Sequence, residues 1–301
     1  MKELTAYVYI SNNSVKVITA NPSKKSKINV AAFYEETFEE GCILNGIIMN
    51  SFVLQEIIAS MWKKHNLPSK NVYLVVNGSS ITTKHMKIPQ MAPNNVVNFI
   101  RTEFKDMDGI QNMLIDYSVV VPKNQDGSCS IFAVISTKEF VSSYVDLFRE
   151  AKIEIGVIDL QQNCLIKLMK SFRSLTDKTF ALAILDKTTL IECLFSNNDF
   201  VTTRRSSIFS VPEEETFRRE IGQHINSLIQ FQKSEQTGAE ITDFFLCGFP
   251  DNAAGLIEYY SESFGINVAA FPECQPGDIT APEEFNPSHY MELLGAISRY
   301  S

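Results

Sequence analysis

The sequence has no apolar run long enough to cross a membrane and no apolar leader at its start. A transmembrane helix needs about 20 consecutive apolar residues, and the longest apolar stretches of the 301-residue chain are far shorter. The first residues, MKELTAYVYI, lead directly into a strand-like segment without the apolar core of a signal peptide. We therefore expect a soluble, cytoplasmic protein that does not itself enter a membrane.

Basic charge is also scarce. The 27 Lys and Arg residues are outnumbered by 35 Asp and Glu residues, which gives a net charge of −8. No helical segment carries a basic stripe, and phosphate neutralisation supplies most of the affinity of nucleic-acid-binding proteins. Nucleic acid is therefore excluded as a partner. The lysine cluster at residues 24–27 is expected to be a solvated loop, with contact to an anionic partner as the alternative.

Paired cysteines and catalytic signatures are missing. The four histidines have no Cys or Ser partner pattern, and no GxSxG, HExxH, Walker A or GxGxxG motif occurs. The cysteines lie far apart without a CxxC pair, so we expect reduced, buried thiols and neither a metal site nor a redox site. They are Cys42, Cys129, Cys164, Cys193, Cys247 and Cys274. No catalytic residue is predicted.

What the sequence does contain is ordinary globular composition, with 45% hydrophobic and 21% charged residues. A chain of 301 residues exceeds one simple core. Strand-like residues 6–10 and 15–19 flank the turn Ser11-Asn12-Asn13-Ser14 and predict a hairpin. A third strand at 28–33, a helix capped by Asn50 or Ser51 and a strand at 72–76 follow.

The next block changes character and predicts a small α+β insertion. It combines a strand at 82–88, a helix over 96–105 capped by Asn94 or Asn95, two strands around a turn at 124–127, and a helix over 138–151. A strand at 157–160 and a helix at 161–172 then resume the first pattern.

The second half opens as the first does. Two strands surround the turn Asp186-Lys187-Thr188-Thr189, a third strand follows at 200–205, and helices are expected over 213–233, 253–264 and 288–298, with strands at 243–247 and 267–270. Each half thus begins with a strand, a short polar turn and two further strands. This internal duplication predicts two similar lobes.

The duplicated plan, with an insertion in the first lobe, resembles the PilM family of type IV pilus assembly proteins within the actin-like superfamily. The stretch GCILNGIIMN at 41–50 is similar to the turn before the family's first helix, and Asp116-Tyr117 to the "DY" that opens a strand of the insertion. YMELLGAI at 290–297 resembles the C-terminal motif. The resemblance implies an α/β, actin-like (ribonuclease H-like) two-lobe fold with a small α+β insertion and a reduced second-lobe accessory subdomain. The implied domains are 1–80 and 155–178 for the first lobe with its interlobe helix, 81–154 for the insertion, 179–284 for the second lobe and 285–301 for a C-terminal helix that packs on the first lobe.

Family members that bind ATP hold nucleotide with two "D-[IF]-G" hairpins and a glycine pair, because aspartates position Mg²⁺ and glycines let backbone N–H groups approach phosphates. Here Tyr9 replaces the first aspartate and Ser11 the glycine, and only one glycine, Gly248, remains of the pair. We therefore expect no cofactor, with ATP and magnesium as the disfavoured alternative. The residues left in this degenerate nucleotide cleft would be Ser11, Asn12, Asn13, Lys16, Asp186, Thr188, Thr189 and Gly248.

The resemblance implies a scaffold that binds other proteins without hydrolysing ATP. The expected partner is the cytoplasmic N-terminal tail of a PilN-type membrane protein, held in a groove between the first lobe and the insertion, which would place the protein at the inner face of the cell membrane. Thr82, Lys84, Met86 and Lys87 on the insertion's entry strand would line that groove. Contact with pilus assembly ATPases and a homo-oligomer stay open. The alternatives are a weak ATPase of pilus assembly and a filament-forming protein of the FtsA kind.

Overall fold

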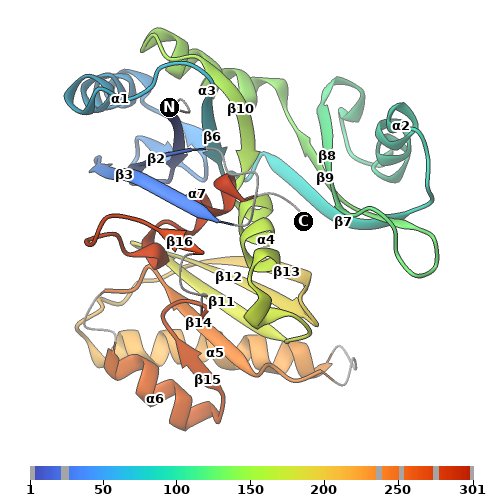
Figure 1. Ribbon diagram of the computed structural model, residues 1–301, viewed down its shortest axis with the longest axis vertical. Coiled ribbons are helices and arrows are strands. Elements are labelled where there is room, and N and C mark those ends of the chain that lie inside the picture. Colours follow the sequence, from blue (N-terminus) through green and yellow to red (C-terminus); the bar gives the residue numbers. More distant parts are fainter. Residues whose placement is uncertain (1–3, 22–26, 235–238, 251–253, 274–277, 299–301) are drawn as a thin grey trace. The chain divides into compact units, whose positions relative to one another are not determined.

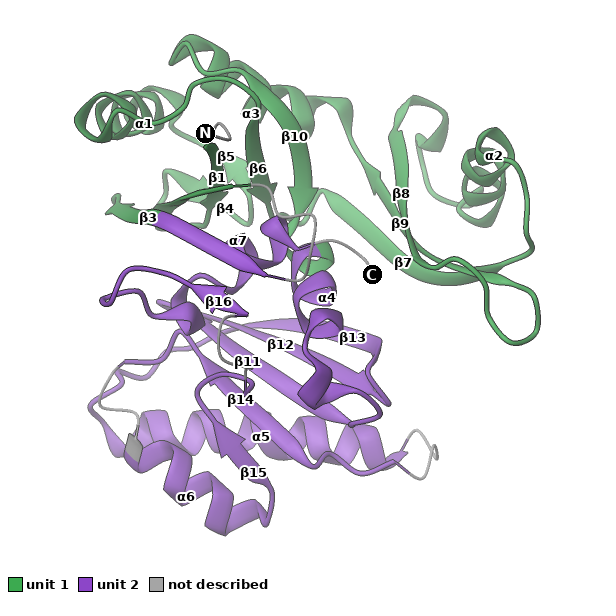
Figure 2. Ribbon diagram, viewed as in Figure 1, with its two compact units in different colours: residues 1–22, 32–163, 300 green, residues 23–31, 164–299, 301 purple. Residues whose placement is uncertain are grey.

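The computed structural model of the chain describes residues 4–21, 27–234, 239–250, 254–273 and 278–298 (Figure 1). Its internal contacts divide it into two compact units, shown in Figure 2. Unit 1 contains residues 1–22 and 32–163, and unit 2 contains residues 23–31 and 164–299. Among the described residues, no helix combines the length and apolar character that a membrane span requires.

The sheet of unit 1 is built on the predicted N-terminal hairpin. β1 (Thr5–Ile10) pairs with β2 (Ser14–Ala20) in antiparallel fashion, and β2 neighbours β3 (Ile28–Thr37). On the other side β6 (Val72–Val76) runs parallel to β1, and β10 (Ile155–Leu160) runs parallel to β6. The sheet order is β10-β6-β1-β2-β3; the first residues of β3, which belong to unit 2, pair with β16 (Ile279–Thr280) of the same unit.

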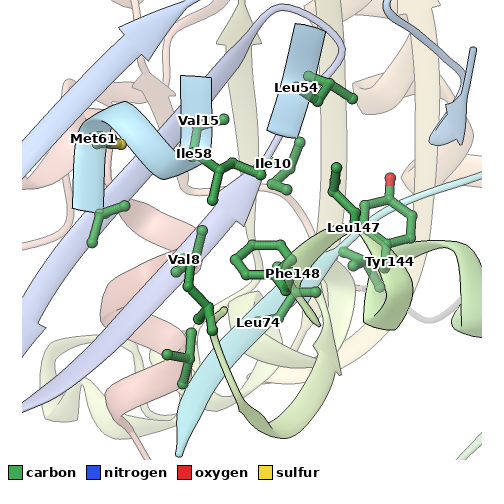
Figure 3. Packing of buried hydrophobic residues seen from close by; sticks show 14 of the residues in the cluster. Val8, Ile10, Val15, Leu54, Ile58, Met61, Leu74, Tyr144, Leu147 and Phe148 are labelled. Atoms are coloured by element: carbon green, nitrogen blue, oxygen red, sulfur yellow. The ribbon is translucent and has the colours of Figure 1, made fainter. Parts of the chain in front are cut away.

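Two helices close the core of unit 1 over this sheet. α1 (Ser51–His65) begins where the Asn50 side chain accepts a hydrogen bond from the backbone N–H of Val53, so of the two predicted caps, Asn50 and Ser51, it is Asn50. Its buried residues pack against the sheet and against α3 (Lys138–Glu150), the last helix of the predicted insertion block (Figure 3). Leu54 and Ile58 from α1 meet Tyr144 and Phe148 from α3 in one apolar cluster.

A small hairpin that was not predicted precedes α1. β4 (Ile43–Leu44) and β5 (Ile47–Ile48) are joined by Asn45 and Gly46, whose φ angles are 49° and 81°. Positive φ at both central residues defines a type I′ turn, the tight turn that Asn-Gly favours most strongly. The backbone N–H groups of Met49 and Asn50 both donate to the carbonyl of Cys42, so the hairpin ends at the α1 cap.

The insertion forms its own small layer of sheet and helix. β7 (Ile81–Ile88) and β8 (Leu114–Val121) pair on either side of β9 (Cys129–Ser136). α2 (Pro93–Glu103) covers one face of this sheet, and the buried side chains between them make a separate apolar cluster. The predicted start of α2 was wrong: Ala92 is the N-cap and Pro93 occupies the first turn, because proline lacks the N–H that would be unsatisfied there.

Unit 2 repeats the sheet plan of unit 1. β11 (Phe180–Asp186) and β12 (Thr189–Ser196) form an antiparallel hairpin, and β13 (Asp199–Ser207) adds to β12. β14 (Asp243–Cys247) and β15 (Asn267–Ala269) continue the sheet in parallel beyond β11. The order β13-β12-β11-β14-β15 matches β3-β2-β1-β6-β10 strand for strand, which confirms the predicted internal duplication.

Helices cover the unit 2 sheet. α5 (Glu215–Ser234) and α6 (Ala254–Phe264) enclose an apolar cluster with β11, β12 and β14. α4 (Gln161–Ser171) leads into the unit, and α7 (Met291–Ile297), preceded by a 3₁₀ turn at Pro287–His289, is buried along its whole length. Only residues 208–214 join β13 to α5, consistent with a reduced accessory subdomain.

Within the described residues the cysteines are buried and form no disulfide. Burial raises the pKa of the Cys193 thiol to about 11 and raises the pKa of Cys247 further in the same direction. A raised pKa keeps these thiols protonated, and only the thiolate is reactive. The two side chains therefore act as small apolar groups in the core.

Candidate functional site

A groove in unit 1 lies between the insertion and the main sheet. Its volume is about 520 Å³, and strands of both sheets contribute to its walls together with the start of α3. The lining residues are Tyr73 and Val76 of β6, Ile81 of β7, Leu114 to Ser118 of β8, Val134 and Ser136 of β9, Phe140 and Val141 of α3, Val157 to Leu160 of β10, and Asn163 of α4.

The groove is bordered by two sheet edges. β8 is an outer strand of the three-stranded sheet, and β10 is an outer strand of the main sheet (Figure 2). Outer strands carry N–H and C=O groups that can pair with an added strand. Along β8 the side chains alternate: Ile115 and Tyr117 pack into the insertion core, whereas Leu114 and Asp116 are more exposed. The arrangement can accept an extended peptide through main-chain hydrogen bonds and side-chain pockets.

The groove wall is apolar with two carboxylates, Asp116 and Asp159, and no Lys or Arg among its lining residues. Asp159 is held in place by three donors: the Tyr73 hydroxyl at 2.5 Å, the Asn163 amide at 2.7 Å and the backbone N–H of Leu160 at 2.7 Å. Asp116, by contrast, is exposed at the groove, and a carboxylate beside apolar walls favours a ligand that carries apolar side chains and a cation.

Contacts between the insertion and the rest of unit 1 fix the groove's width. The Thr83 hydroxyl of β7 donates to the Gln162 side chain of α4 at 2.8 Å. Phe140 lines the groove and also belongs to the main apolar cluster of unit 1. A Cβ atom at Gly78 would lie 2.8 Å from the Phe140 ring, so this glycine permits the close packing at the entry to β7. The groove is therefore built largely before any ligand binds.

The four residues predicted to bind a partner lie on β7. Met86 is buried in the insertion core, and Lys87 is exposed. Lys84 forms an exposed ion pair with Glu103 of α2 at 3.3 Å and lies 5.6 Å from the centre of the Phe104 ring. Thr82 is half-buried. The β7 residue that lines the groove is Ile81, and none of these four does.

In unit 1, the turn between β1 and β2 uses its own side chains to hold itself together. The Ser11 hydroxyl accepts hydrogen bonds from the backbone N–H groups of Asn13 and Ser14 at 3.2 and 3.1 Å. The Asn12 side chain accepts from the N–H of Gly46 at 3.4 Å, and the carbonyl of Asn13 accepts from Phe38 at 3.0 Å. The Ser11 oxygen thus occupies the backbone donors that a glycine would leave open to a phosphate.

Tyr9 fills the place where the resemblance expects an aspartate. Its side chain is 2% exposed, and its hydroxyl accepts a hydrogen bond from the Gln161 amide at 3.0 Å. Lys16 lies opposite Tyr9 in the β1–β2 register and is also buried. A phenol in place of a carboxylate removes the oxygen ligands that magnesium prefers. In the part of the chain that the structure describes, no three His, Cys, Asp or Glu side chains group as metal ligands.

The remaining predicted cleft residues gather at one end of the unit 2 sheet. Asp186 ends β11 and pairs with Thr189, while Lys187 turns the chain with φ of 52° and the carbonyl of Thr188 accepts from Ile208 at 2.7 Å. Gly248 follows β14 beside them, with φ of 71° and a Cβ position only 2.5 Å from the carbonyl oxygen of Leu185. Close strand packing therefore requires this glycine.

The groove residues on β8 and β10 were not predicted as a site. Both segments had been singled out in the sequence, Asp116-Tyr117 as a family motif and 157–160 as a strand, but neither pattern tells which edges face each other. Alternation of apolar and polar residues on β8 was the available signal for a strand with one face in a core and the other free.

Comparisons with known proteins were made for sequence and for structure. A family model described as "Type IV pilus assembly protein PilM" matches residues 8–205. No curated protein matches the chain in sequence.

Solved structures match the fold. A chain of a PilM-PilN type IV pilus biogenesis complex is 13% identical, with 99% of this chain and 98% of that chain covered and a TM-score of 0.77. A Bacteroides thetaiotaomicron protein of actin-like ATPase fold and unknown function is 11% identical over 97% and 96% of the chains, with a TM-score of 0.55. The cytoplasmic domain of EpsL, an inner-membrane component of the Vibrio cholerae type II secretion system, is 9% identical over 98% and 94%, with a TM-score of 0.50. These likenesses confirm the expected mixed α/β, actin-like fold.

Proposed function

Since the chain belongs to the PilM family of type IV pilus assembly proteins, we propose that it is a scaffold that holds an extended segment of a PilN-type protein in the groove between β8 and β10. The observation that carries the proposal is that the outer strands of two separate sheets, β8 and β10, border the same apolar groove. The likeness over 99% of this chain to a chain of a PilM-PilN complex supports the choice of partner. Through such a partner the protein would work at the inner face of the cell membrane.

The groove chemistry narrows the kind of segment that fits. Leu114 and Val157 leave apolar surface at the groove, with exposed fractions of 40% and 45%. A peptide that alternates apolar and polar residues would bury apolar side chains there while its backbone pairs with a strand edge. A basic side chain of the same peptide would meet the exposed Asp116.

A binding measurement tests the proposal. A fluorescent peptide of the first dozen or so residues of the PilN-type protein from the same genome is expected to bind the full chain in an anisotropy titration. Val157→Arg should weaken that binding at least about 30-fold, roughly 2 kcal/mol, because the guanidinium obstructs the apolar wall. The matched control is Val119→Arg, which changes a valine of β8 that is 40% exposed, against 45% for Val157, and lies outside the groove lining; it should leave the affinity within about twofold.

Either of two results would reject this assignment: a peptide that does not bind the wild-type chain, or one that binds Val157→Arg as tightly as wild type. Lys84→Glu tests the predicted role of β7 separately. Because the Lys84–Glu103 pair is exposed, its loss costs little stability. Weaker peptide binding by this variant would indicate that the bound segment also contacts β7.

We also propose that the protein acts without hydrolysing ATP. The support is local: Tyr9 stands in the place of a metal-binding acid, and Ser11 already uses the backbone donors of its turn. Millimolar Mg-ATP is therefore expected to shift the melting temperature by less than about 1 °C, since a ligand stabilises a fold only when its concentration exceeds its Kd. A rise of several degrees, with phosphate release above background, would favour the weak-ATPase alternative.

A further inference from the structure

The β4–β5 hairpin and the start of α1 expose an apolar surface that the groove does not include. Its members, named here the hairpin patch, are Leu44, Ile47, Met49 and Phe52, with exposed fractions of 58%, 46%, 62% and 65%. Leu44 and Ile47 are direct partners across the hairpin. Four large apolar side chains within nine residues form a local cluster, whereas single exposed apolar residues need no explanation.

The hairpin patch is held rigidly from beneath. The buried Tyr144 hydroxyl of α3 donates to the carbonyl of Gly46 at 2.7 Å. The N–H of Ser79 donates to the carbonyl of Asn45 at 3.0 Å, and the Asn12 side chain accepts from the N–H of Gly46. A Cβ atom at Gly46 would lie 1.9 Å from the carbonyl oxygen of Asn77. Three separate segments therefore fix the turn, and a preorganised surface loses little entropy when it binds.

Folding alone does not account for the exposed side chains. The opposite pair of the same hairpin, Ile43 and Ile48, already supplies the core contact, with Ile43 2% exposed and Ile48 packed against the main cluster. Phe52, at the start of α1, is likewise an exposed apolar side chain that the core does not use. α1 buries Leu54, Ile58 and Met61, whereas Phe52 on the same helix is 65% exposed.

Charge around the hairpin patch indicates what covers it. Residues 28–62 contain five acids and no Lys or Arg. Glu39 and Glu40 lie just before the hairpin and are exposed, and Glu56 follows Phe52 by four positions, on the same side of α1. An acidic margin repels a second copy of the same patch and also an anionic membrane leaflet. It suits a protein surface with an apolar centre and a margin of Lys or Arg.

We infer that the hairpin patch is a second docking surface, separate from the groove, for a partner protein whose contact face is apolar and flanked by basic side chains. The probe is a helical peptide with Leu on one face and Lys on the other, titrated against the full chain. It is expected to bind the wild-type chain, and Leu44→Ser/Phe52→Ser should weaken binding at least about tenfold. Both side chains are mostly exposed, so the double variant should fold normally, as circular dichroism and the melting temperature would verify.

Three controls make the result specific. Phe209→Ser removes an exposed aromatic of unit 2, 88% exposed, and should leave binding unchanged. A Leu/Glu peptide should not bind, because its margin repeats the charge of the patch. Val157→Arg should bind the Leu/Lys peptide as wild type does, so failure of the groove proposal leaves this one standing.

Several outcomes would overturn the inference. If the double variant binds the Leu/Lys peptide as tightly as wild type does, the binding comes from general attraction between the basic peptide and a chain of net charge −8 and not from the hairpin patch. A dimer in light scattering that Leu44→Ser/Phe52→Ser dissolves would make a second copy the occupant. Co-sedimentation with phosphatidylglycerol vesicles that depends on Phe52 would make a membrane the occupant.

Discussion

Adding one methyl group at Gly295 is expected to destabilise unit 2 by about 3 kcal/mol or more. In α7 the Cβ of an alanine here would lie 2.0 Å from the carbonyl oxygen of Cys164 and 2.4 Å from its carbonyl carbon. These are backbone atoms of α4, so no side chain can rotate away to make room. The two helices would have to separate, although every residue of α7 is buried. Overpacking usually costs 1–3 kcal/mol, and backbone contact places this site at or above the upper end.

The matched control is Gly255→Ala in α6. A Cβ atom at Gly255 has no neighbour within 4 Å, so the same substitution adds a methyl group in open space. Alanine is the better helix former, and this variant should be as stable as wild type or more stable by up to about 1 kcal/mol. Thermal melting followed by circular dichroism compares the two variants. Similar melting temperatures for both would show that α7 can move from α4 without loss.

Local elements could be predicted from the sequence because their causes are local. The Asn50 cap and the turn from Asp186 to Thr189 between β11 and β12 need only neighbouring residues, and both lie where the sequence indicated. The β4–β5 hairpin was missed although Asn45-Gly46 is a strong turn signal. Its strands have only two residues each, too few for an alternating pattern to identify.

Contacts between distant segments set the limit of prediction. The sequence indicated that Tyr9 and Ser11 replace a metal ligand and a glycine, but not that Tyr9 would accept a hydrogen bond from Gln161, 152 positions away. The groove also depends on contacts between distant segments. β8 and β10 contribute to its walls because two sheets meet there. The residues of one strand do not indicate which other strand edge it faces. The tight space at Gly295 likewise appears only when α4 is present.

The second large effect is expected at Glu192, a buried carboxylate on β12 of unit 2 with an exposed fraction of 1%. Its oxygens contact Arg204 Nη2 at 3.2 Å and His224 Nδ1 at 3.1 Å, and Arg204 also donates to the Ser227 hydroxyl at 3.1 Å. Glu192→Leu would leave the arginine without its counter-charge. Removing one partner of a buried pair costs about 3–5 kcal/mol. Because the Arg204 side chain is 36% exposed, we expect the lower end of that range.

Removing both charges should cost much less than removing one. Arg204 lies directly opposite Glu192 in the β12–β13 register, so Glu192→Leu/Arg204→Met places two apolar side chains side by side on that face. Such replacements of buried ion pairs are often neutral. Urea denaturation of the single and double variants should show that the double variant regains most of the lost stability. If the losses of the two single variants simply add in the double variant, Glu192 and Arg204 are not coupled, and an unpaired buried charge does not explain the cost of Glu192→Leu.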